Sequence, residues 1–133
     1  MPVIRHPDIP TRERRPGHRT RNLVDRAQGA NGLSMTESVL DPGAAVPLHT
    51  HRVEEAIVVQ RGHGVFQLGD ATMTVDADAT VLVPPEVVHG FHNPGPGQLT
   101  ILGVFPVADP LTDRWTTYLE GTPPPGFHAG ATL

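Results

Sequence analysis

Three residues near the middle of the chain combine the side chains and the spacing of metal ligands: His49, His51 and Glu55. Alternate residues of a β-strand share one face, so a near-continuous extended run points all three the same way, whereas Glu54 faces away. Two imidazole nitrogens and a carboxylate oxygen suit divalent Fe, Mn, Ni, Cu, Co or Zn better than Ca or Mg, which prefer oxygen ligands. Taken alone, a histidine pair at this spacing is more often exposed or simply hydrogen-bonded than bound to metal.

The residues around this segment form a longer pattern. Five residues separate Gly43 from His49, one separates the two histidines, three lead to Glu55, and six more lead to Gly62. A second segment follows, with the sequence Pro84-Pro85-Glu86-Val87-Val88-His89 and, after three further residues, Asn93. Together the two segments resemble the two motifs of the cupin superfamily, which consists of small jelly-roll barrels.

The match to the first motif is complete at every fixed position, and the second motif matches at its proline, histidine and asparagine. Asp78 and Glu86 stand where the second motif has glycine. A glutamate disfavours positive φ, so these two departures bear on the local turn geometry. They change none of the ligand positions.

This resemblance implies a fold and a metal site. The fold is all-β, a double-stranded β-helix of the jelly-roll type. The implied metal ligands are His49, His51, Glu55 and His89, and the implied cofactor is one divalent transition metal (Fe, Mn, Ni, Zn or Cu). Three histidines and a glutamate buried together without an ion would leave costly unpaired polar groups, which favours a loaded site.

Other residues are candidates for the surroundings of the metal. We expect a substrate pocket lined by apolar side chains, although each of them could equally belong to an ordinary core: Met35, Val39, Phe66, Met73, Phe91 and Phe105. Glu37 shares the strand parity of Met35 and Val39, so it is a candidate catalytic acid or base if that face points inward. His92 should face away from the ligand side, and His63 lies in a turn between two glycines.

Four protein ligands leave two adjacent positions on an octahedral metal, for water, dioxygen or a bidentate substrate. The first functional hypothesis is therefore a dioxygenase acting on a small carbonyl or enol compound. A second is Lewis-acid chemistry without redox, as in an isomerase, lyase or polyketide cyclase, and a third is a non-catalytic ligand-binding module. No arginine is expected to face inward from the barrel strands, which argues against phosphate-bearing substrates and fits an uncharged or singly anionic compound.

Short apolar runs divided by Gly, Pro and Asp predict the strands that would position these residues. The predicted strands are Leu33–Leu40, Val46–His51, Val53–Gln60, Gly64–Leu68, Ala71–Val75, Thr80–Val83, Val88–Asn93 and Gln98–Val107. One helix is predicted near Leu111–Leu119, after Asp109-Pro110. The predicted organisation is an extended arginine-rich arm at 1–22, the barrel at 23–108, and a short helix with a proline-rich tail at 109–133.

Length and charge narrow the remaining possibilities. The chain has 133 residues, the size of one domain, and contains no cysteine that could form a disulfide or a thiolate site. Its net charge of −4 argues against nucleic acid as the main partner. We expect no membrane segment, a cytoplasmic protein, a small-molecule substrate, and a homodimer in which the arm could add a strand to the partner's sheet.

Overall fold

The computed structural model describes residues 2–120, and over this range almost all of the regular secondary structure is β-strand. Two short 3₁₀ helices are present, η1 (His6–Asp8) and η2 (Arg26–Gln28). The strands are β1 (Arg12–Arg15), β2 (His18–Val24), β3 (Ser34–Leu40), β4 (Ala45–His51), β5 (Glu55–Arg61), β6 (His63–Leu68), β7 (Ala71–Asp76), β8 (Ala79–Val83), β9 (His89–His92), β10 (Leu99–Phe105) and β11 (Thr116–Tyr118). Each of the eight predicted strands is confirmed.

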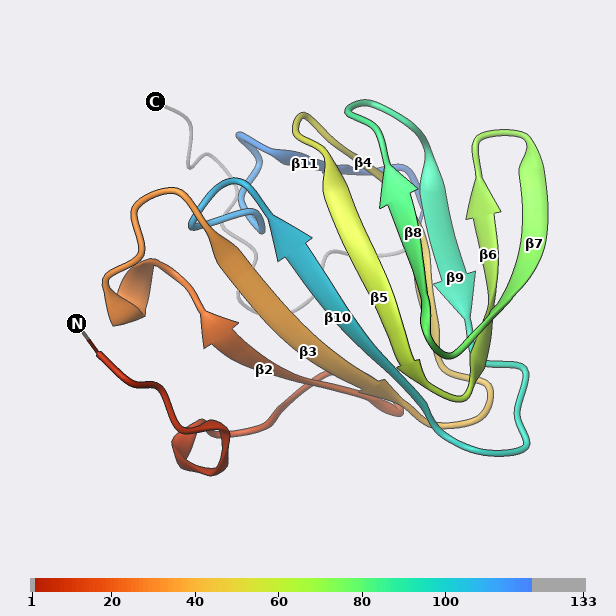
Figure 1. Cartoon of the computed structure of the whole chain (residues 1–133). Helices are drawn as coiled ribbons and strands as arrows, with labels where there is room; N and C mark the ends of the chain where they lie inside the picture. Colours follow the sequence, from red (N-terminus) through yellow and green to blue (C-terminus); the bar gives the residue numbers. More distant parts are fainter. Residues whose placement is uncertain (1, 121–133) are drawn as a thin grey trace.

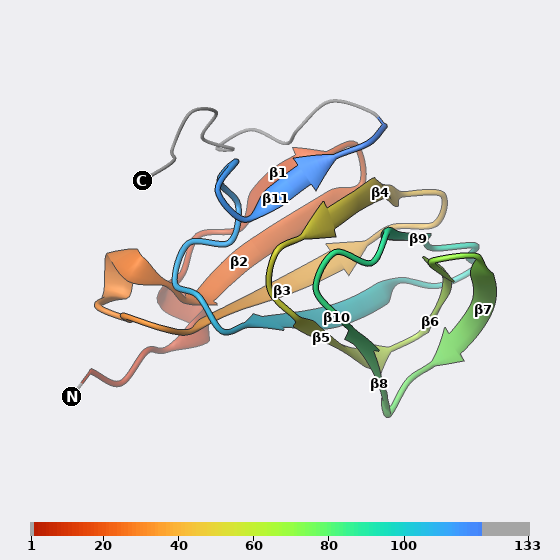
Figure 2. The same ribbon diagram turned by 90° about the horizontal axis from the view of Figure 1, so that it is seen from above.

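The strands form two sheets that face each other around a common interior (Figures 1 and 2). One sheet has the order β1-β2-β3-β10-β5-β8, and the other has the order β11-β4-β9-β6-β7. Neighbouring strands pair antiparallel throughout. This arrangement confirms the predicted all-β jelly-roll barrel.

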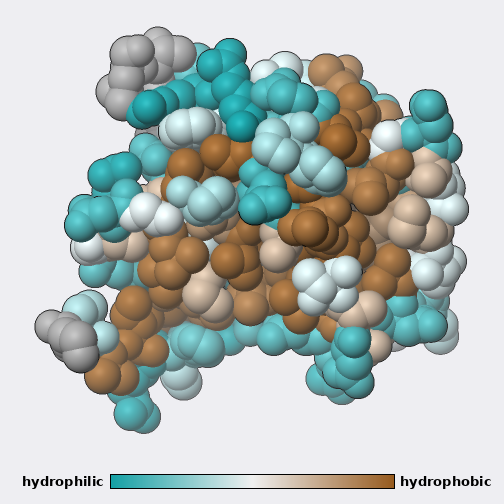
Figure 3. All heavy atoms as spheres, turned by 45° about the horizontal axis from the view of Figure 1, so that its top comes forward, coloured by the Kyte–Doolittle hydropathy of each residue, from teal (hydrophilic) through white to brown (hydrophobic). Residues whose placement is uncertain are grey.

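Alternating burial explains why these segments form strands. Along β10 every second residue is buried, from Leu99 to Phe105, so one face of the strand packs inside while the other is partly covered. Leu40, Ile57 and Val59 join this face in one apolar core. Hydrophobic side chains also gather across the middle of the face seen in Figure 3, with hydrophilic ones along its borders, so apolar surface is not confined to the interior.

Tight turns between the strands require unusual backbone conformations. Gly62 has φ +78°, and a Cβ at this position would collide with the backbone carbonyl of Gln98. Asp78 and Glu86 adopt φ values of 67° and 68° without being glycine. The two departures from the second motif therefore keep the left-handed backbone that glycine adopts easily, and they bear its steric cost.

The N-terminal segment differs from the predicted arm. Residues 12–24 contain β1 and β2, which pair with each other, and β2 also pairs with β3 in the chain's own sheet. The segment is extended, as expected, but it extends the barrel instead of projecting from it. Alternation of apolar residues could not reveal these strands, because their inward positions include the polar residues His18 and Thr20.

The predicted C-terminal helix is wrong. Residues 111–119 contain turns and the short strand β11, which pairs with β4 through Thr116↔His51 and Tyr118↔His49. Consecutive threonines and a tyrosine are typical of strands, and pairing with β4 decides the outcome. The predicted proline-rich tail at 121–133 lies outside the described residues. Within residues 2–120, neither helix is long enough or apolar enough to span a membrane.

Candidate metal centre

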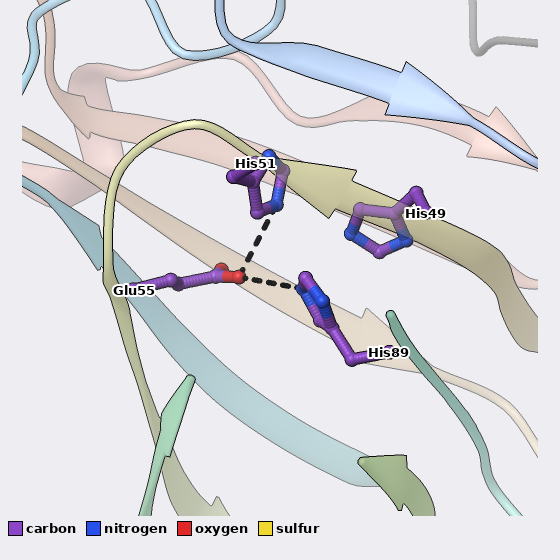
Figure 4. A group of neighbouring side chains, drawn as sticks. All are labelled: His49, His51, Glu55 and His89. Carbon is purple, nitrogen blue, oxygen red and sulfur yellow. Dashed lines mark hydrogen bonds and ion pairs between the residues drawn. The ribbon is translucent and has the colours of Figure 1, made fainter. Parts of the chain in front are cut away.

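Four side chains from three strands, two in the five-stranded sheet and one in the six-stranded sheet, meet inside the barrel (Figure 4). His49 and His51 project from the same face of β4, Glu55 begins β5, and His89 begins β9 directly opposite His49. All four are buried, and one potential ligand atom from each lies within 4.8 Å of the others. The structure thus brings together all four residues predicted as ligands.

The histidine rings are oriented by hydrogen bonds on the far side from the cluster. The Nδ1 atom of His49 lies 2.7 Å from the carbonyl oxygen of Pro47, and that of His89 lies 2.8 Å from the carbonyl oxygen of Val87. A carbonyl can only accept, so both Nδ1 atoms carry the proton in the neutral ring. The Nε2 lone pairs are then available to ligate a cation.

His51 is oriented through a chain of two hydrogen bonds. Its Nδ1 lies 2.8 Å from the hydroxyl of Thr116, and that hydroxyl donates to the carbonyl of Pro110 at 2.6 Å. The hydroxyl hydrogen is committed to Pro110, so Thr116 accepts from Nδ1–H of His51. All three rings therefore share one tautomer.

In this tautomer the unprotonated Nε2 atoms of His51 and His89 face the carboxylate of Glu55, which can also only accept a hydrogen bond. Oε1 of Glu55 lies 3.3 Å from Nε2 of His51 and 3.2 Å from Nε2 of His89. Two nitrogen lone pairs and a carboxylate oxygen at these distances repel one another unless a positive charge lies among them, either a proton on Nε2 or a metal ion. The buried donor set of three imidazoles and one carboxylate fits a divalent transition metal.

The protonation states also suit ligation. Burial lowers the pKa of His49 to about 3, and the neighbouring His89 and His51 act in the same direction. Burial raises the pKa of Glu55, but hydrogen bonds that His51 and His89 donate when a proton is on Nε2, together with their charge, outweigh burial and lower this pKa to about 2. At neutral pH the cluster thus offers a neutral imidazole at His49 and an ionised carboxylate.

A cavity of about 80 Å³ adjoins the cluster and is lined by His49, His51 and Glu55. Phe91 and Phe105 form apolar walls, and Phe105 packs edge-on against His51 with ring centroids 4.9 Å apart. Gly103 makes room for the carboxylate, because a Cβ there would lie 3.0 Å from Oε2 of Glu55. The cluster is therefore accessible from a small, mostly apolar cavity.

Of the six predicted pocket residues, only Phe91 and Phe105 line this cavity. Phe66 is buried behind it, stacked on Phe91 with ring centroids 4.8 Å apart. Met73 is 37% exposed on the edge strand β7, so its prediction as a pocket residue is wrong.

The face of β3 that points away from the cavity carries Met35, Val39 and Glu37. Thr36 and Ser38 line the cavity, and alternate residues of a strand face opposite ways. The carboxylate of Glu37 accepts a hydrogen bond from Arg21 at 2.7 Å, outside the barrel interior. The predictions of Met35 and Val39 as pocket residues and of Glu37 as a catalytic group are therefore corrected.

Other cavity residues were missed by sequence reasoning, namely Arg14, Arg15, His18 and Tyr118. The expectation that no arginine faces the interior is wrong. The barrel was predicted to begin at residue 23, so the arginines of the preceding segment were not considered as interior residues. Tyr118 packs against His49 with the two rings tilted and their centroids 5.4 Å apart, and it lies on the segment expected to be helical. The motif pattern carries no signal for any of these positions.

Comparison with known proteins agrees with this architecture. Residues 36–105 match the model of the family described as "Cupin domain". No curated protein matches the sequence significantly.

Solved structures with the same fold include the polyketide cyclase RemF from Streptomyces resistomycificus, 24% identical, with a TM-score of 0.75 over 92% of this chain and 87% of that one. KdgF from Halomonas sp. is 18% identical, with a TM-score of 0.70 over 82% of this chain and 96% of that one. A cupin-like protein from Thermotoga maritima is 24% identical, with a TM-score of 0.67 over 78% of this chain and 77% of that one. At these identities the likeness concerns the fold.

Proposed function

We propose, from the premise that this chain belongs to the cupin domain family, that it is a metal-dependent enzyme acting on a small carbonyl or enol compound. The observation that carries the proposal is the convergence of His49, His51, Glu55 and His89 beside the cavity. A bound divalent ion would supply Lewis acidity and, if redox-active, electron transfer to dioxygen. The chain's own residues hold the neutral histidine rings in one tautomer, and Phe91 and Phe105 give the cavity apolar walls.

Dioxygenase chemistry is our first candidate for the reaction. Four protein ligands leave two of six octahedral positions, enough for a substrate and dioxygen together. The apolar walls of the cavity suit an organic substrate that must be kept from water.

A non-redox isomerase, lyase or cyclase is the second candidate, and Tyr118 favours it. Burial raises the pKa of this phenol, which Arg15 opposes, so the phenol stays protonated at neutral pH. Tyr118 lines the cavity and packs against His49, so its hydroxyl can hold a proton near a substrate oxygen. RemF, which shares the fold, is a polyketide cyclase.

The test begins with the metal content of the purified protein. We expect about one Fe, Mn, Ni, Cu or Zn per chain in the wild type and a loss of stoichiometric metal in His51→Ala. His92→Ala is the matched control, because this exposed histidine lies on β9 outside the cluster. Unchanged metal in His51→Ala would contradict the assignment.

Oxygen-electrode traces with β-diketones and catechol-like enols then separate the reactions. Oxygen uptake that depends on substrate and is absent in His51→Ala supports the dioxygenase. Substrate loss without oxygen uptake supports the second candidate, as does a protein that holds only Zn. If no substrate in the panel is consumed under either condition, the protein is better described as a ligand-binding module.

A further inference from the structure

A β-bulge turns two consecutive arginines toward the cavity. In the pairing of β1 with β2, Glu13 lies opposite Arg19 and Arg15 lies opposite His18, which leaves Arg14 as an extra residue. An extra residue breaks the alternation of a strand, so neighbouring side chains can share a face. Arg14, Arg15 and His18 accordingly all line the cavity that contains the metal ligands.

Arg14 brings a positive charge to this side of the cavity. Arg14 is half-buried, and its Nε donates to the hydroxyl of Thr20 at 3.1 Å. Among residues 2–120, Arg14 forms no ion pair with a carboxylate, and Glu55 is the only acid that lines the cavity. Burial lowers the pKa of Arg14, and this effect is opposed by Tyr118 and reinforced by Arg15 and Arg12. A partly desolvated cation of this kind favours an anionic ligand.

His18 provides a second, independent sign of a missing ligand. The residue is only 4% exposed, yet neither ring nitrogen has a hydrogen-bond partner among the described residues. Burial lowers its pKa to about 4, reinforced by Arg14, Arg15 and Arg19. A neutral imidazole offers one N–H donor and one acceptor, and leaving both buried and unpaired is costly.

We propose that Arg14, Arg15 and His18 bind a carboxylate of the substrate, while its carbonyl or enol oxygens face the metal ligands. This inference rests on the proposed function and specifies its substrate class. The ring of Tyr118 lies between the arginines and the metal ligands. Arg15 Cζ is 5.4 Å from the ring centroid of Tyr118, and that centroid is 5.4 Å from the ring centroid of His49. The planar guanidinium matches the geometry of a carboxylate, and the imidazole N–H can donate to a carboxylate oxygen.

The experiment compares two probes of the same shape that differ in charge, 3,4-dihydroxybenzoate and 3,4-dihydroxybenzamide. Isothermal titration calorimetry with metal-loaded protein measures the Kd of each. We expect the acid to bind wild type about tenfold more tightly than the amide, and Arg14→Gln to remove most of this preference. The amide should bind Arg14→Gln and wild type alike. Arg12→Gln is the matched control, because Arg12 lies on the same strand but is exposed and does not line the cavity.

Equal affinity for the two probes in the wild type would overturn the inference, and that comparison needs no variant. Failure of the acid to bind, or a preference that survives in Arg14→Gln, would overturn it as well. Metal analysis of the same samples keeps the two proposals distinguishable. Full metal without a charge preference leaves the proposed function standing, whereas a charge preference in protein without metal supports this subsite alone.

Discussion

The ring of His51 depends on a residue far away in the sequence. Its Nδ1–H donates to the hydroxyl of Thr116, which in turn donates to Pro110. We predict that Thr116→Val, which keeps the shape of the side chain but removes the hydroxyl, weakens metal binding by about 10–100-fold. Competition with a chromogenic chelator measures the affinity.

Thr116→Ser is the control for this substitution, because it retains the hydroxyl and should bind metal nearly as well as the wild type. A valine variant with wild-type affinity would show that the hydrogen-bond chain does not orient His51.

Among single residues, the sequence predicted the four metal ligands but not the residues that position them. Strand parity grouped His49 and His51 correctly, because both lie on β4, and the second motif supplied His89. Glu55 was grouped with them on the expectation of one near-continuous extended run, but the chain bends at residues 52–53 and Glu55 begins β5 in the other sheet, so the first motif, and not parity, accounts for its place in the site. Thr116 could not be found in this way, since its contact with His51 spans 65 positions and no periodicity connects them. Gly103 is similarly hidden, because its role is to leave space for Glu55.

Among the elements, the turn before β9 bears the clearest strain. Glu86 has φ 68°, its side chain is exposed, and its backbone N–H donates to the carbonyl of His51 at 2.7 Å. We predict that Glu86→Gly stabilises the protein by about 1 kcal/mol, because relief of the left-handed conformation outweighs the greater entropy of the unfolded glycine. Urea denaturation measures this change.

Glu54→Gly is the matched control for the turn, since Glu54 is exposed and its φ is not positive. It should lower the free energy of unfolding through the entropy term alone. A decrease in stability for both variants would show that the turn before β9 is not strained.

The errors in predicting the elements from the sequence have identifiable physical causes. On β3 the apolar residues Met35 and Val39 suggested an inward face, but the buried residues are Ser34, Ser38 and Leu40, so most of the inward face of this strand is polar. Residues 111–119 lacked any local signal for their pairing with β4. Apolar alternation identifies the inward face of a strand only where the interior itself is apolar.

For the molecule as a whole, the buried His18 couples stability to pH. Its pKa of about 4 lies below the ordinary value of 6.5, so the unfolded chain binds the proton more readily. The contribution of neutral His18 to the free energy of unfolding is fully present above pH 6.5. It is lost as the pH falls toward 4, which lowers the free energy of unfolding by up to about 3 kcal/mol. Denaturation of wild type and His18→Gln at pH 7 and pH 5 measures this contribution.

The comparison concerns the change with pH in each protein, so a uniform destabilisation of the variant does not affect it. We expect a smaller loss between pH 7 and pH 5 in His18→Gln than in wild type. His92→Gln, at an exposed position, should behave as the wild type does. Parallel pH profiles for all three proteins would place the acid sensitivity elsewhere.

The bulge at Arg14 also has an evolutionary consequence. It lies on β1, at the edge of the six-stranded sheet, so only β2 pairs with this strand. Loss of the one extra residue would restore ordinary alternation and change which arginine faces the cavity, while the β2–β3 pairing and all four metal ligands stay in place. Single-residue insertions and deletions in this strand therefore offer the lineage a way to change substrate charge preference without rebuilding the metal centre.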